Sequence, residues 1–86
     1  IRYIQSDADY TEIFTVEKKY LSNEPLRYWD EYLDSKRFVR IHKSYILNIS
    51  KIEKIIGNQV RLDNNTNLPI GRAYKDSFMK LVLNIS

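Results

Sequence analysis

The stretch from residue 38 to residue 48, FVRIHKSYILN, holds the densest group of polar side chains in the sequence. The polar residues are Arg40, His42, Lys43, Ser44 and Asn48. Apolar residues alternate with them, which predicts a half-buried strand that runs into a polar loop. Arginine, lysine, serine and asparagine are the usual donors to phosphate oxygens, and arginine and asparagine also read base edges. This segment therefore favours contact with nucleic acid.

The same residues make poor catalysts. Ser44 lies near His42, but residues two apart on a strand point the same way and cannot form a catalytic triad unaided. Acidic residues gather at 7–9 and at 30–34, in a predicted loop and on the predicted exposed face of a helix. The chain has no cysteine and one histidine, and it has no glycine-rich phosphate loop. We expect no enzyme activity, no cofactor and no metal site.

Charge is divided unevenly along the 86 residues, which at 10.3 kDa suffice for one domain. Residues 1–34 carry four basic and eight acidic groups, a balance of −4. Residues 35–86 carry ten basic and three acidic groups, a balance of +7 within an overall net charge of +3. Such asymmetry favours a basic face that meets an anionic partner. A solvated surface with uneven charge is the alternative.

The first third of the chain is typical of short strands, with turns at residues 6–9 and near Lys18. A helix is expected next, because Leu26, Trp29 and Leu33 fall on one helical stripe. Ser22 or Asn23 is the predicted N-cap, with Pro25 in the first turn. At this spacing Trp29 is interpreted as a core residue rather than a ligand platform.

Short extended segments continue through residues 38–62. Gly57-Asn58 predicts a tight hairpin, and Pro69 predicts an edge strand or a strand end. A four-residue repeat of apolar positions predicts a terminal helix over residues 72–83, with Gly71 as a weak cap. The pattern as a whole predicts a mostly β domain with six to eight short strands, one short internal helix and one C-terminal helix.

Four segments together resemble the LytTR domain, the DNA-binding output module of many bacterial response regulators. The polar stretch fits the family pattern F-x-R-x-H-[RK]-S-[YF]-[IL]-x-N, and residues 1–11 are similar to its opening I-x-Y-I-E-A-x-x-N-Y-T. The stripe of Leu26, Trp29 and Leu33 matches its small helix. Residues 68–74, LPIGRAY, resemble its closing L-P-V-S-R-x-Y.

The resemblance implies three small antiparallel sheets in an elongated β-β-β arrangement, and loops rather than a recognition helix that enter the grooves of DNA. The implied loops are Asp9-Tyr10-Thr11, His42-Lys43-Ser44 and Gly71-Arg72, with Thr11, Lys43 and Arg72 reading the DNA. The predicted DNA-binding residues are Tyr10, Thr11, Arg40, His42, Lys43, Ser44, Asn48, Arg72 and Lys75.

Structural roles stay open for several of these residues. His42 fits a loop-holding hydrogen bond as well as a DNA contact, and Ser44 and Asn48 can bond the backbone of the turn, the interpretation favoured for Asn48. Arg40 is expected to face solvent beside the groove and to contact phosphate. Lys75 is interpreted as non-specific basic background.

Some positions depart from the family pattern. Lys43 stands where arginine is common and lacks its planar fork. Gly71 replaces the usual serine, and Asp9 replaces asparagine or glycine. The chain also begins at an internal strand of the pattern, so residues 1–86 are predicted to form a single LytTR-like domain that is truncated at its N-terminus relative to the family. Either the chain is a fragment, or its first sheet has an unpaired edge.

Double-stranded DNA is the implied partner, bound by a dimer on direct repeats. The implied whole protein is a cytoplasmic bacterial two-component regulator with an N-terminal receiver or sensor domain. No apolar run is long enough to span a membrane, and the N-terminus is no signal peptide. The rival hypothesis is a β domain of the same ancestry that docks a protein partner through tyrosine-rich loops.

Overall fold

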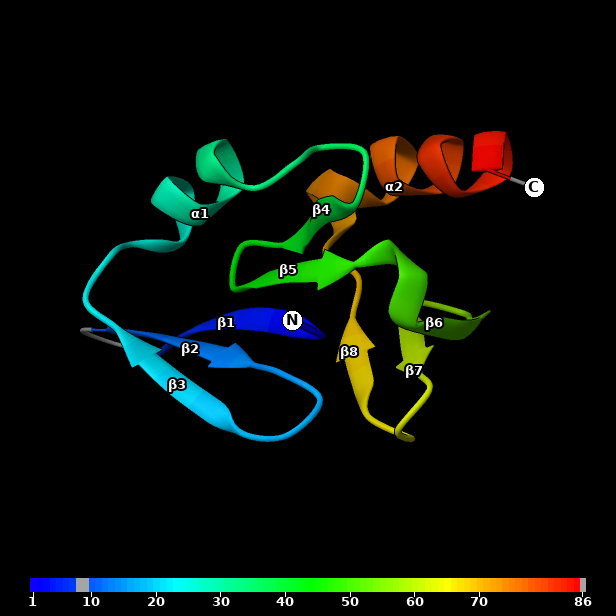
Figure 1. Cartoon of the computed structure of the whole chain (residues 1–86). Helices are drawn as coiled ribbons and strands as arrows, with labels where there is room; N and C mark the ends of the chain where they lie inside the picture. The colour runs from blue at the N-terminus through cyan, green and yellow to red at the C-terminus, as the bar shows by residue number, and fades with distance from the viewer. Residues whose placement is uncertain (8–9, 86) are drawn as a thin grey trace.

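The computed structural model describes the backbone of residues 1–7 and 10–85 and the side chains of these residues up to Leu83. This part of the chain forms eight strands and two α-helices, which confirms the mostly β class (Figure 1). The elements in chain order are β1 (Tyr3–Asp7), β2 (Tyr10–Phe14), β3 (Lys19–Ser22), α1 (Leu26–Tyr32), β4 (Phe38–His42), β5 (Tyr45–Asn48), the 3-10 turn η1 (Ile49–Lys51), β6 (Ile52–Ile56), β7 (Gln59–Leu62), β8 (Asn67–Pro69) and α2 (Arg72–Ile85).

The strands form two antiparallel sheets, where the resemblance implied three. The larger sheet has the order β3-β2-β1-β5-β4, and the smaller one the order β6-β7-β8. One sheet is formed because β1 pairs on both sides: Tyr3 lies opposite Phe14 of β2 and opposite Leu47 of β5. β1 is therefore an interior strand of the described sheet, and β3 and β4 form its edges. The molecule measures 33 × 25 × 21 Å, a moderate elongation.

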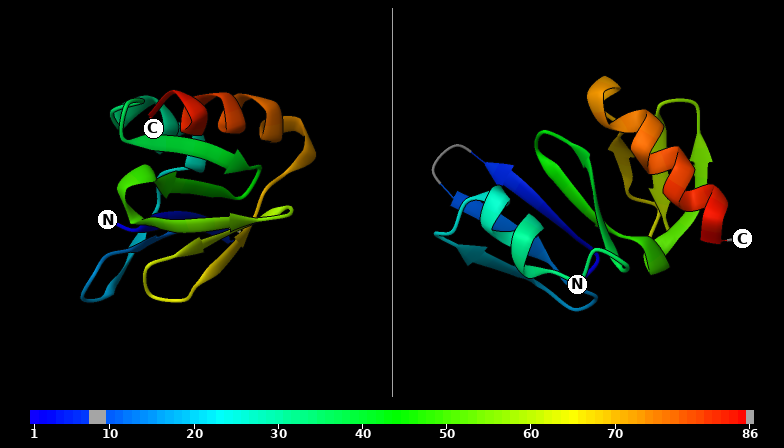
Figure 2. Two further views of the ribbon diagram at one scale, coloured as in Figure 1. Left: turned by 90° about the vertical axis from the view of Figure 1, so that its right-hand side faces the viewer. Right: turned by 90° about the horizontal axis from the view of Figure 1, so that it is seen from above.

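The main hydrophobic core lies where the two sheets and α2 meet (Figure 2). Its buried members are Tyr3, Ile41, Leu47, Val60, Leu62, Leu68, Ile70 and Phe78. Burial, with nearby Tyr45 and Glu12, raises the pKa of the Tyr3 phenol. A second cluster of Ile4, Leu26 and Ile46 lies beneath α1, and Trp29 packs against it, as its helical spacing predicts. The two clusters fix α1 and α2 against the sheets.

Local structure follows the sequence signals in most places. β2 and β3 pair as a hairpin across the turn expected near Lys18, Gly57 adopts a φ of 58° in the β6–β7 turn, and Pro69 ends the edge strand β8. The predicted N-cap of α1, Ser22 or Asn23, is wrong, because Pro25 occupies that position and has no side-chain hydrogen bond to the helix. The Ser22 hydroxyl instead accepts the Glu24 N–H at 3.1 Å in the connection before the helix. Within the described residues, no helix is long and apolar enough to span a membrane.

Candidate nucleic-acid interface

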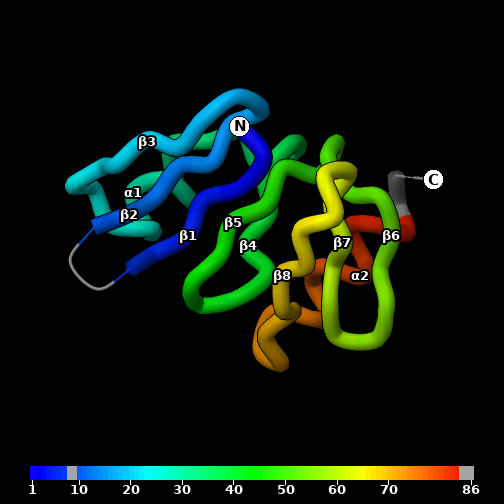
Figure 3. The backbone as a smooth tube through the Cα atoms, turned by 90° about the horizontal axis from the view of Figure 1, so that it is seen from below, coloured from blue at the N-terminus to red at the C-terminus, as the bar shows by residue number. Residues whose placement is uncertain are grey.

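Three segments that are distant in sequence meet at one edge of the molecule. The N–H of Ser6, near the end of β1, donates to the carbonyl of Ser44 in the β4–β5 turn at 2.9 Å. The N–H of Gly71, between β8 and α2, donates to the carbonyl of Ile41 in β4 at 2.6 Å. These bonds bring together the end of β1, the β4–β5 turn and the start of α2, and the β6–β7 turn follows them along the same side of the molecule (Figure 2, right panel, and Figure 3). We call this side the joined edge. Two of the predicted DNA-binding loops are thus brought together here, and the third adjoins them.

Arg40 shapes the β4–β5 turn from within. Its Nε donates to the carbonyl of His42 at 3.1 Å, and its Nη2 donates to the carbonyl of Lys43 at 2.6 Å. Its Nη1 lies 3.7 Å from the Asp30 carboxylate on α1, and the guanidinium lies 5.7 Å from the centre of the Tyr74 ring on α2. The side chain is 23% exposed. Arg40 does not project into solvent as expected, because the two carbonyls of the turn hold its guanidinium.

His42 has a structural hydrogen bond within the same turn. Its Nδ1 accepts the Ser44 N–H at 3.1 Å. The ring also meets Tyr45 edge-on, with centroids 5.5 Å apart. Of the two roles that the sequence left open, the loop-holding one is present.

Gly71 permits the close approach of α2 to this turn. A Cβ at this position would lie 3.3 Å from Cα of His42 and 3.2 Å from Cδ2 of Tyr74. Both separations are shorter than ordinary van der Waals contact. The serine that the family pattern has here would therefore require the Tyr74 ring and the backbone at His42 to shift by a few tenths of an ångström.

Three predicted contact residues have exposed side chains. Lys43 is exposed in the β4–β5 turn, and Arg72 is exposed as the first residue of α2. Tyr10 begins β2 and is 40% exposed. Asp9, assigned to the same predicted loop, lies outside the described residues. Ser44 is half-buried beside Lys43.

Two other predicted contact residues are engaged inside the chain. Thr11 is 1% exposed, and its hydroxyl donates to the Glu24 carbonyl at 2.6 Å. It faces inward because side chains alternate along a strand and its neighbour Tyr10 faces outward. Asn48 donates from Nδ2 to the Ile1 carbonyl at 2.7 Å and accepts the Ser50 N–H at 3.0 Å, which is the structural role favoured for it.

The fold brings Asn58, for which no functional role is predicted from the sequence, to this edge. Its Oδ1 accepts a hydrogen bond from the Lys75 ammonium at 2.6 Å, and the two residues line a pocket of about 400 Å³ with Ile70 and Arg72. Lys75 is thus held in place rather than a free background charge. Gly57-Asn58 signals a hairpin turn, but a turn signal does not tell which edge the turn will join.

The family model for the LytTr DNA-binding domain matches residues 1–83 of this chain. The chain belongs to the LytTR family. One curated relative is the transcriptional regulatory protein LytR of Staphylococcus aureus strain N315, 33% identical over 73 residues. Another is the heme-containing CO-sensing transcriptional regulator RcoM 2 of Paraburkholderia xenovorans, 36% identical over 64 residues.

These matches cover 79% and 74% of this chain but only 30% and 22% of the two relatives. The chain therefore spans less than a third of the length of these regulators. A solved LytTr DNA-binding domain from Bacillus cereus has the same fold, with a TM-score of 0.91 at 23% identity, over 95% of this chain and 80% of that one. The LytTR family consists of DNA-binding regulatory domains, and the mostly β fold described above is that of its solved member.

Proposed function

We propose that this chain binds duplex DNA in a sequence-specific manner, through loops that enter the grooves, as the output domain of a bacterial transcription regulator. The observation that carries the proposal is the joined edge, on which Lys43 and Arg72 present exposed cations from segments tied by the Ser6–Ser44 and Ile41–Gly71 hydrogen bonds. Backbone hydrogen bonds of this kind hold the two segments that carry these cations at a fixed spacing. A fixed spacing is what successive contacts along a duplex require.

The residues of the edge divide into two groups in this proposal. Lys43, Arg72 and Tyr10 contact the DNA, with Arg72 placed to read a base edge and Lys43 to bind phosphate. Ser44 and Lys75 lie beside them and add phosphate contacts. Arg40, His42, Thr11 and Asn48 act as positioning residues, since each has at least one polar side-chain atom in a hydrogen bond within the chain.

The whole protein is proposed to work in the cytoplasm as a two-component regulator. Its relatives are named as transcriptional and sensory regulators, and most of their length lies outside the matched region. An N-terminal receiver or sensor domain and binding as a dimer to direct repeats fit this assignment. Both remain parts of the proposal.

The proposal is tested by selecting duplexes from a random-sequence pool and titrating the enriched sequence, fluorescently labelled, at several salt concentrations. We expect a defined sequence to be enriched. We expect the logarithm of the binding constant to fall linearly with the logarithm of salt concentration, with a slope of about −0.9 per phosphate contact. An absence of enrichment, or an affinity independent of salt, would contradict the proposal.

Arg40→Lys separates a positioning role from a phosphate contact. Lysine keeps the charge but cannot donate to two carbonyls in the fork geometry of arginine. We expect the free energy of unfolding to fall by about 1.5–3 kcal/mol, the range for hydrogen bonds from a charged donor, and the DNA affinity to fall with it. Urea unfolding and duplex titration measure both. Arg37→Lys, at an exposed position ahead of β4, is the control. If Arg40→Lys kept full DNA affinity, Arg40 would be a phosphate contact rather than a positioning residue.

A protein-docking role is the second candidate, because α1 carries exposed aromatic side chains. Tyr28 and Tyr32 stack with centroids 5.7 Å apart and are 40% and 69% exposed. Tyr28→Ala/Tyr32→Ala leaves the joined edge intact. If this double variant binds the selected duplex normally, DNA binding does not use these two rings, and the docking role is then judged on regulation in cells by the full regulator.

A further inference from the structure

Asn58 ties the β6–β7 turn to α2 and to the segment that precedes it. Its carbonyl accepts the Ile70 N–H at 2.7 Å, and its side-chain Oδ1 accepts a hydrogen bond from the Lys75 ammonium at 2.6 Å. Gly71, the residue after Ile70, donates to Ile41 of β4, so the turn, the β8–α2 junction and β4 are linked in series. The joined edge therefore contains a fourth segment, the β6–β7 turn, that the three predicted loops do not include.

Lys75 carries a charge that no acidic side chain neutralises in the part of the chain that the structure describes. None of the salt bridges formed there involves its ammonium. The pocket that it lines with Asn58, Ile70 and Arg72 has no acidic residue in its wall. Asp76 follows Lys75 directly on α2, and adjacent residues of a helix do not face each other. A neutral amide oxygen thus holds the ammonium and leaves its charge in place.

The stability of α2 does not explain this arrangement. Arg72 and Lys75 are both cations in the first turn of the helix, which contains no acidic residue. The dipole at the start of a helix favours anions, so both cations are unfavourable there. A carboxylate in place of Asn58 would hold the ammonium more strongly, because charge-assisted hydrogen bonds are stronger than neutral ones. It would also cancel the charge, so the amide suits a cation that meets an anion from outside the chain.

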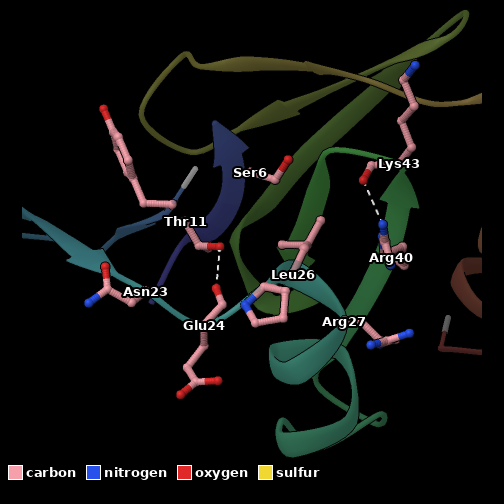
Figure 4. A pocket seen from close by; sticks show the side chains of 10 residues that line it. Ser6, Thr11, Asn23, Glu24, Leu26, Arg27, Arg40 and Lys43 are labelled. Atoms are coloured by element: carbon pink, nitrogen blue, oxygen red, sulfur yellow. Dashed lines mark hydrogen bonds between the residues drawn. The ribbon is translucent and has the colours of Figure 1, made fainter. Parts of the chain in front are cut away.

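The two lysines of the joined edge differ in how they are held. The carbonyl of Lys43 accepts a hydrogen bond from Arg40, while the Lys43 ammonium extends away from the guanidinium (Figure 4). The Lys75 ammonium, in contrast, is itself the group that is bonded. A long side chain that is ordered only when a partner binds lowers the affinity, and a lysine that is already held avoids most of this loss.

We propose that Asn58 is a positioning residue of the DNA interface, which holds the Lys75 ammonium for a backbone phosphate of the duplex beside the β6–β7 turn. The inference rests on the proposed function, because it takes the anion to be the duplex bound at the joined edge. It adds a fourth segment to that interface. A phosphate contact carries no base information, so Asn58 acts on affinity and leaves the preferred sequence unchanged.

The first test is Asn58→Ala, which removes the amide oxygen and keeps the backbone carbonyl that accepts the Ile70 N–H. Lys75 then keeps its charge but has to be ordered when the duplex binds. We expect the affinity for the selected duplex to fall by about 2- to 10-fold, with the salt slope and the order of sequence preference unchanged. Lys75→Ala should instead make the slope shallower by about 0.9, one phosphate contact. Urea midpoints close to that of the original chain show that both variants are folded.

A double-mutant cycle separates positioning from a purely structural role of the turn. In the Lys75→Ala background, we expect Asn58→Ala to change the affinity by less than about twofold, because no ammonium is left to hold. Combined with Lys43→Ala, the effect of Asn58→Ala should multiply that of the lysine change, since the two residues act independently. If Asn58→Ala caused the same loss with and without the Lys75 side chain, Asn58 would act through the turn itself, which would overturn the inference.

Asn58→Asp gives a further measurement that a loss of folding cannot imitate. The aspartate still accepts the Lys75 ammonium, but it offsets the charge that is offered to the phosphate. The control is Asn65→Asp, which adds the same charge at an exposed position in the β7–β8 turn, at the other end of β7 (Figure 3). We expect Asn58→Asp to weaken duplex binding several-fold more than Asn65→Asp, without a lower urea midpoint. Equal weakening in both variants would reduce the effect to net charge and contradict the positioning role.

Failure of this inference can be told apart from failure of the proposed function. If the original chain binds the selected duplex and Asn58→Ala binds it equally well, the inference is wrong and the proposed function stands. If the original chain binds no duplex, the proposed function is wrong, and the positioning role of Asn58 is overturned with it.

Discussion

Arg72→Ala is expected to lower the affinity for the selected duplex by about 5- to 150-fold, which corresponds to about 1–3 kcal/mol for a lost bidentate base contact. The side chain is exposed at the first position of α2, where a cation gains nothing from the helix dipole. Its removal should therefore leave the stability of the fold unchanged or slightly higher. Fluorescence anisotropy at a fixed salt concentration measures the loss.

The control for Arg72→Ala is Lys80→Ala, an exposed cation farther along the same helix. It removes the same charge away from the joined edge, and we expect a change below twofold. A second comparison uses duplexes with single base changes, on which Arg72→Ala should lose discrimination at one position. If Arg72→Ala lost the same affinity on every duplex, Arg72 would be a phosphate contact. If Arg72→Ala and Lys80→Ala lost the same affinity, Arg72 would not belong to the interface.

The fold was predictable from the sequence where the signals are local. The hairpin at Gly57-Asn58, the helical stripe beginning at Leu26 and the terminal helix all follow from patterns within a few residues. The joining of β1 to β5 pairs Tyr3 with Leu47, far along the chain, and no periodicity reports such a pairing. That single long-range ladder turns the three expected sheets into two. The N-cap error is smaller: Ser22 uses its hydroxyl in the connection that precedes the helix.

The site was predictable as a segment and less so as a set of side chains. Composition and alternation marked residues 38–48, and the structure brings that turn to the joined edge beside Arg72. Residue type did not tell that Arg40 would bind two carbonyls of its own turn, since the same guanidinium fork suits a phosphate equally well.

The placement of the joined edge depends on the core behind it, and especially on Phe78 of α2. Phe78 is fully buried in the main cluster, which also contains Ile41 of β4 and Ile70 just before α2. α2 packs on β4 through this cluster, and the Ile41–Gly71 hydrogen bond lies at the end of the same contact. Loss of the ring would therefore loosen the helix that presents Arg72.

Phe78→Ala is expected to lower the free energy of unfolding by about 3–5 kcal/mol, because it removes a buried ring and leaves a cavity. Small domains have about 5–15 kcal/mol in total, so this variant also loses DNA affinity as its folded fraction falls. Urea unfolding followed by circular dichroism gives the loss.

Leu21→Ala, at a side chain 66% exposed on β3, should change the free energy of unfolding by no more than about 0.5 kcal/mol. Phe78→Leu keeps most of the volume and should lose less than Phe78→Ala, which preserves the comparison if the alanine variant does not fold. A loss from Phe78→Ala no larger than that from Leu21→Ala would show that the buried ring does not hold α2 on the sheets, and the positioning of Arg72 would then need another cause.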